Sequence, residues 1–130
     1  MNAQAPSLAL RICYGVAVVL VGLTVYSGLS DAPGVLRAPE NTKQLVVGVA
    51  QLVFAAAALA TLVGLALRAS WSVVAAIVWA VACTTTATFA SVAWDTSGGI
   101  PAVLGALLGA SAGTGLVVWC IKRYLRAAAQ

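Results

Sequence analysis

The sequence predicts an all-α integral membrane protein with four transmembrane helices packed as an antiparallel bundle. Of its 130 residues, 62% are hydrophobic and 8% are charged, whereas an ordinary soluble domain has roughly 45–50% apolar and about 25% charged residues. The mean hydropathy is +1.04. A soluble domain of this length and composition would expose large apolar patches to water, and a bilayer covers such patches.

Four long stretches without Asp, Glu, Lys or Arg set the number of helices. A helix crosses a hydrocarbon layer of about 30 Å with roughly 20 residues, and each stretch supplies that length. The first stretch is also longer than the core of a signal peptide, about 7–15 residues, so we expect it to be retained. The expected spans of this single domain lie near residues 12–29, 45–66, 71–94 and 101–121.

The basic residues predict the orientation, because Lys and Arg near the ends of membrane helices stay preferentially in the cytoplasm. The first and third connections hold two of the 7 basic residues and all 3 acidic ones. We therefore expect both termini in the cytoplasm, in a multi-pass protein of a bacterial cytoplasmic (inner) membrane. The positive net charge follows from this asymmetry, so the lipid bilayer, and not nucleic acid, is the expected partner. The basic residues on the side of the termini are Arg11, Arg68, Lys122, Arg123 and Arg126.

The connections between the spans differ in length. The short segment Arg68-Ala69-Ser70 lies between the second span and the third, which predicts a tight antiparallel hairpin. The first outer loop, over residues 31–43, contains the turn-forming pair Pro33-Gly34. We expect this loop to be long enough to fold over the mouth of the bundle.

Small residues on the last span predict a close helix contact. Gly105, Gly109 and Gly113 recur every fourth residue, and small residues at this spacing let two helix backbones approach each other in lipid. The facing helix belongs either to the same chain or to another subunit, and the sequence leaves both alternatives open.

A polar stripe on the third span is the main candidate for a ligand or partner site. Thr84, Thr88, Ser91 and Asp95 share one helical face, and Gln51 lies at a matching depth on the second span. These side chains are candidates for a polar pocket beneath the first outer loop. In the alternative interpretation, the hydroxyl groups bond to carbonyl groups of their own helix, and Gln51 ties two helices together.

Trp79 lies deep within the third span, unlike the tryptophans expected near the membrane surface. A buried indole N–H needs an acceptor. That acceptor is either a group inside the bundle or a bound molecule, so Trp79 is also a candidate contact residue.

The residues that are missing exclude several kinds of chemistry. The chain has no histidine, which excludes imidazole-based triads and metal sites. We expect no metal site, no catalytic residues and no tightly bound cofactor. The three cysteines, Cys13, Cys83 and Cys120, form no CxxC pair. Cys13 and Cys120 share a cytoplasmic depth at which they could meet, but a reducing cytosol predicts free thiols.

The chain resembles the DoxX-like family of small four-helix membrane proteins. The resemblance rests on Arg11, Gly15 and Gly22, on the segment Val47-Gly48-Val49-Ala50-Gln51-Leu52, and on Gly64-Leu65-Ala66-Leu67-Arg68. Some members of that family are membrane subunits beside redox or sulfur-handling enzymes, including quinone-linked ones. The resemblance therefore implies other membrane chains as partners, and a quinone or a lipid as a contact.

Two classes of function follow from these observations. The leading expectation is a non-catalytic membrane subunit that anchors or completes a larger complex. The alternative is a small homo-oligomeric transporter or channel with a polar path along the third span. An enzyme is not expected, because no acid, base and nucleophile are placed to act together.

Overall fold

The computed structural model describes residues 5–93 and 99–129, which form four α-helices and confirm the predicted all-α fold. All four are long and apolar enough to cross a membrane. The helices are α1 (Leu8–Arg37), α2 (Thr42–Ala66), α3 (Ser72–Ala93) and α4 (Gly99–Ala128).

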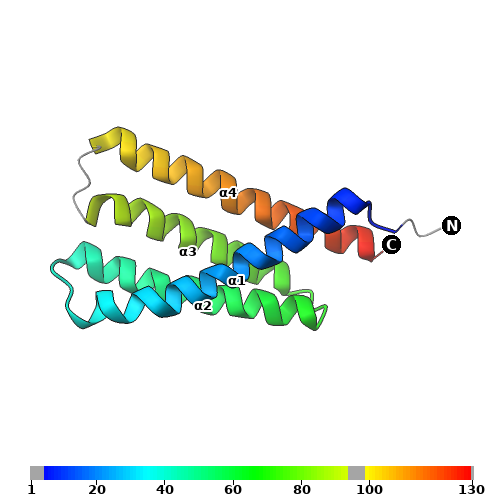
Figure 1. Ribbon diagram of the computed structural model, residues 1–130, viewed down its shortest axis with the longest axis horizontal. Helices are drawn as coiled ribbons and strands as arrows, with labels where there is room; N and C mark the ends of the chain where they lie inside the picture. Colours follow the sequence, from blue (N-terminus) through cyan, green and yellow to red (C-terminus); the bar gives the residue numbers. More distant parts are fainter. Residues whose placement is uncertain (1–4, 94–98, 130) are drawn as a thin grey trace.

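The helices run alternately up and down, and each packs beside the next one along the chain (Figure 1). α4 also contacts α1, so the four helices form a closed ring. Both ends of the described chain lie at one end of the bundle, together with the α2–α3 connection. We call this the terminal end, and we call the opposite end, which holds the α1–α2 connection, the distal end.

α1 is longer than predicted, and the prediction of an outer loop over residues 31–43 is wrong. The helix continues through Pro33 to Arg37, and only residues 38–41 connect it to α2. Proline removes one helical hydrogen bond, but it lies close to the C-terminal end of this helix. Packing favours the helix, because Ala32 is fully buried and a Cβ atom on Gly48 of α2 would lie only 2.8 Å from Leu36.

The α2–α3 connection is as short as predicted, and an unusual residue forms its turn. The amide of Ala69 donates to the carbonyl of Gly64 at 2.8 Å, and the amide of Arg68 donates to that of Leu65 at 3.2 Å. This pair of hydrogen bonds defines a Schellman motif, whose left-handed residue is most often glycine. Here that residue is Arg68, with a φ of 53°.

The core lies in the terminal half of the bundle and consists mainly of small and medium-sized side chains. Ala17 and Val21 of α1, Ala58 of α2, Ala76 of α3 and Ile121 of α4 are all nearly or fully buried in one cluster. Small side chains let the backbones approach closely, as membrane helices require. At Gly28 of α1, an added Cβ would lie 2.8 Å from Ala55 of α2.

Candidate functional site

The hydroxyl groups of the predicted polar stripe bond to their own helix. Thr84 Oγ1 donates to the carbonyl of Ala80 at 2.9 Å, and Thr88 Oγ1 donates to that of Thr84 at 2.8 Å. Ser91 Oγ donates to the carbonyl of Thr88 at 2.6 Å. These bonds correspond to the second interpretation of the stripe, in which the hydroxyl protons need no ligand. Asp95 and its neighbours 94–98 lie outside the described residues.

A cleft of 310 Å³ nevertheless separates α3 from α4 next to Thr84. Four hydroxyl groups line it, those of Thr84, Thr85, Ser111 and Thr114, and each donates to a carbonyl of its own helix. Their oxygen atoms keep lone pairs that can accept a further hydrogen bond. The cleft therefore offers acceptors, within an otherwise apolar span, to a ligand or partner that carries a donor.

Gln51 belongs to a different part of the bundle from this cleft. Its side chain is half-buried on α2, and its backbone carbonyl faces Gly28, where an added Cβ on α1 would lie 2.8 Å away. The side-chain Oε1 atom is buried and has no hydrogen-bond partner among the described residues. A buried, unpaired amide oxygen is costly, so among the predicted site residues that the structure describes, Gln51 has a buried acceptor without a donor.

Trp79 has its partner inside the bundle. The side chain is 2% exposed, and its Nε1 donates to Thr24 Oγ1 of α1 at 2.8 Å. Of the two alternatives for the indole N–H, the structure contains the internal acceptor. Trp79 thus links the diagonal helices α1 and α3.

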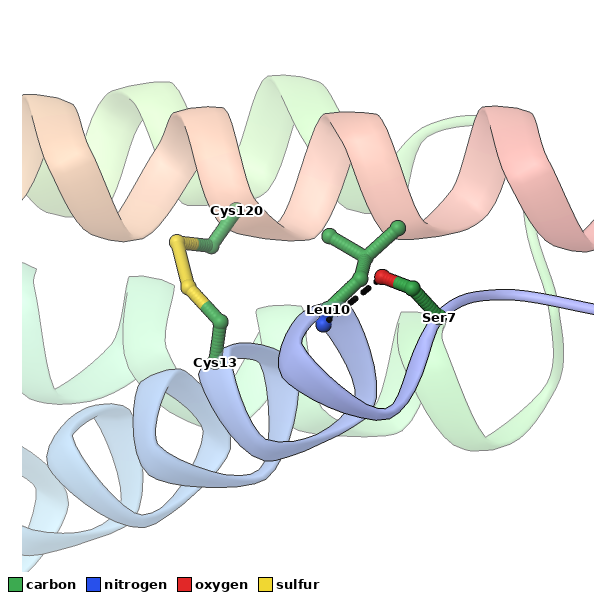
Figure 2. Close-up of a disulfide and its surroundings, with 4 residues drawn as sticks. All are labelled: Ser7, Leu10, Cys13 and Cys120. Atoms are coloured by element: carbon green, nitrogen blue, oxygen red, sulfur yellow. Dashed lines mark hydrogen bonds between the residues drawn. A yellow bond between two sulfur atoms is a disulfide. The ribbon is translucent and has the colours of Figure 1, made fainter.

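The prediction of free thiols is wrong for two of the three cysteines. Cys13 of α1 and Cys120 of α4 form a disulfide (Figure 2). Their Cα atoms are 6.2 Å apart, within the usual range for such a bond. The prediction relied on the expected compartment, whereas the packing of α1 on α4 brings the two side chains together. Cys83 is a free, half-buried thiol, as expected.

A polar cluster at the distal end was not predicted from the sequence. Gln44 is buried, and its Oε1 accepts a hydrogen bond from the amide of Glu40 at 3.0 Å. Asn41 caps α2 by accepting from the amide of Gln44 at 2.9 Å, and its Nδ2 donates to the carbonyl of Ala93 at 3.5 Å. The Asn-x-x-Gln spacing is the signal for this cap. The cluster ties the α1–α2 connection to the end of α3.

The glycine face of α4, formed by Gly105, Gly109 and Gly113, meets no other part of the chain that the structure describes. A Cβ atom added at any of the three would have no neighbour within 4 Å among the described residues. In the structure, this face therefore does not pack on a described helix of the same chain, which was one of the two alternatives. A contact with another subunit remains a prediction.

Together, the fold and these sites define a multi-pass, all-α protein whose four helices are suited to spanning a membrane. No protein-family model, curated protein or solved structure matches the chain.

Proposed function

We propose that this protein is a non-catalytic membrane subunit that completes a larger complex and meets its partner through the glycine face of α4. The observation that carries the proposal is the exposure of the first half of α4. The helix has 30 residues, and its buried residues are Val117, Cys120 and Ile121, all in the second half.

The chain's other helix contacts support this use of glycine. Gly28, Gly48 and Gly64 each lie where an added Cβ would come within 2.8 Å of a neighbouring helix or turn. At these three positions, glycine lets a neighbouring helix or turn approach closely. The glycine face of α4 has the same residue type at helical spacing, and it has no neighbour within residues 5–93 and 99–129.

The kind of partner follows from the resemblance to the DoxX-like family. That resemblance favours a redox or sulfur-handling complex, with contact to a quinone or to lipid, in a bacterial cytoplasmic (inner) membrane. The partner chain supplies any catalytic residues. This chain contributes helix surface, and its termini face the cytoplasm.

The test is to extract the tagged protein in a mild detergent and to identify the co-migrating chains by mass spectrometry. Different chains in a fixed ratio are expected. Gly109→Leu should release them, because a leucine side chain separates the two backbones. The matched control is Gly15→Leu on α1, where an added Cβ also has no neighbour within 4 Å. Co-migration that survives Gly109→Leu, or a chain that migrates alone, would contradict the proposal.

A small homo-oligomeric transporter or channel is the second candidate function. The observations in its favour are the hydroxyl-lined cleft between α3 and α4 and the unpaired Oε1 of Gln51. In the same extraction, a complex that contains only copies of this chain would favour this second candidate.

A further inference from the structure

A second cavity, of 770 Å³, lies at the terminal end of the bundle. The α2–α3 connection and the start of α3 form one side of it, the C-terminal part of α4 forms another, and α1 contributes Tyr14. Unlike the α3–α4 cleft, it is lined by charged side chains. Its ionisable and hydroxyl-bearing lining residues are Tyr14, Arg68, Ser70, Ser72, Lys122, Tyr124 and Arg126.

Three cations line this cavity. Arg68 comes from the α2–α3 connection, while Lys122 and Arg126 are one turn apart on α4 and share a face. None of the three forms an ion pair with any residue that the structure describes. Asp31 and Glu40 lie toward the distal end. The cavity therefore gathers positive charge that the described part of the chain does not neutralise.

Arg68 occupies a position that would suit glycine better. Its φ of 53° is the left-handed conformation at the end of the Schellman motif, in which a Cβ atom is disfavoured. The turn itself gains nothing from an arginine there. An arginine at this position does place a guanidinium group at the cavity.

Neutral hydrogen-bonding groups complete the lining. The rings of Tyr14 and Tyr124 stack with centroids 4.0 Å apart and an interplanar angle of 13°, which fixes both side chains beside the cations. Ser70 precedes α3, and the first turn of α3 borders the cavity with Ser72 and Val73. The positive end of that helix dipole thus adds to the side-chain charges.

We propose that this cavity binds a phosphate group at the membrane surface. Guanidinium, ammonium and hydroxyl groups beside a helix N-terminus are the donors that phosphate oxygens accept from. The cavity lies at the ends of helices long enough to cross a bilayer, which is the depth of lipid headgroups. The phosphate belongs either to the headgroup of an anionic phospholipid or to a soluble phosphate.

The chain contains a natural control for this site. Arg123 is adjacent to Lys122 in the sequence, but its guanidinium lies 5.1 Å from the centroid of the Trp119 ring, and it does not line the cavity. General attraction of the basic end to an anionic membrane would depend on Arg123 as much as on its neighbours. Among these basic residues, a built site depends on Arg68, Lys122 and Arg126, and not on Arg123.

The experiment measures binding to the full-length protein in a neutral detergent. Native mass spectrometry reports whether added phosphatidic acid or phosphatidylglycerol is retained in preference to phosphatidylcholine, and isothermal titration calorimetry measures inorganic phosphate. We expect one saturable site per chain. Arg68→Gly and Lys122→Gln should each weaken binding about tenfold, as expected for loss of one charge-assisted hydrogen bond. Arg123→Gln should leave it unchanged.

The outcomes separate the two sources and test the site. Retention of anionic lipid without binding of inorganic phosphate identifies a headgroup, and the reverse identifies a soluble phosphate. Equal losses for Arg68→Gly, Lys122→Gln and Arg123→Gln would overturn the proposal in favour of diffuse attraction. Absence of saturable binding by the wild-type chain to either probe would overturn it outright. Arg68→Gly suits the turn, so a loss of binding in that variant does not come from misfolding.

Discussion

Trp79 and Thr24 join two helices that do not otherwise lie side by side. The indole Nε1 donates to Thr24 Oγ1 at 2.8 Å, and that hydroxyl donates to the carbonyl of Val21 at 2.6 Å. The chain of two hydrogen bonds crosses the bundle from α3 to the backbone of α1. It satisfies the only polar atom of a large buried side chain, and so it fixes how α1 and α3 are rotated relative to each other.

Thr24→Val should destabilise the bundle by about 1 kcal/mol, because the buried indole N–H loses its acceptor. Unfolding in mixed detergent, followed by tryptophan fluorescence, measures the change. The control is Thr85→Val, since the Thr85 hydroxyl is exposed and donates only to Val81 of its own helix. Adding Trp79→Phe to Thr24→Val should recover part of the loss. An equal cost for the Thr24 and Thr85 variants would contradict this account of the pair.

Arg68→Gly should stabilise the fold by about 1 kcal/mol, since glycine adopts the left-handed conformation without a clash at Cβ. Arg68→Ala is the matched control, because it removes the same charge but keeps the Cβ atom. The alanine variant should therefore show no such gain. Equal unfolding free energies for the two variants would show that the backbone at residue 68 is not strained.

The disulfide should hold α1 and α4 together after the chain is cut. A protease site inserted at residues 38–41 lies between the two cysteines, which are separated by 107 positions in the sequence. After cleavage, the fragments should remain linked on a non-reducing gel and separate with dithiothreitol. Cys120→Ser should abolish the link, whereas Cys83→Ser should leave it intact. Fragments that separate without a reductant would mean that the two thiols are free.

The orientation can be tested at the two ends of the bundle. In a chain without its three native cysteines, a cysteine at Pro39 should react with a membrane-impermeant reagent from outside intact cells, and one at Ala128 should not. The basic residues of the terminal end predict this result. The disulfide lies at the same end, and disulfides persist in oxidising compartments. The reverse labelling pattern would therefore favour the disulfide over the basic residues as the guide to orientation.

Thr84→Val and Thr88→Val test whether the polar stripe has a role beyond its own helix. Under the proposed subunit function, both variants should match the parent in expression and in co-migrating chains, because each hydroxyl donates to a carbonyl of α3. Thr84 lines the α3–α4 cleft and Thr88 does not. A Thr84 variant that assembles normally, but loses an activity that the Thr88 variant keeps, would favour a ligand path through the cleft.

The sequence predicts the number and order of the helices well, because only long stretches without charged residues can lie in the hydrocarbon layer at low cost. It predicts their ends less well. Pro33-Gly34 is a strong turn signal, yet the packing of Ala32 and Leu36 on α2 keeps the last turns of α1 helical. Local turn preference is weak compared with such packing, and the packing partner is not visible in the local sequence.

The site residues are harder to predict. The positions of the charged residues indicate where each helix begins and ends, but they do not indicate which face of a helix points toward its neighbours. The sequence predicts a matching depth for Gln51 and Thr84, but Gln51 lies on α2 and does not line the α3–α4 cleft beside Thr84. Cys13 and Cys120 meet, as their expected common depth allows, but the expected reducing compartment predicts free thiols and the structure contains a disulfide. Arg68 was recognised as part of a short turn, but its left-handed conformation follows from the hydrogen bonds around it.

The four helices differ in length, which gives the protein a sensitivity to bilayer thickness. α1 has 30 residues and α2 has 25. At about 1.5 Å per residue, α2 exceeds a hydrocarbon layer of about 30 Å by several ångströms, and α1 exceeds it by roughly 15 Å. Longer helices adapt to a thin membrane by tilting. Thinning the bilayer should therefore tilt α1 more strongly than α2, and the disulfide between Cys13 and Cys120 should pass that tilt on to α4.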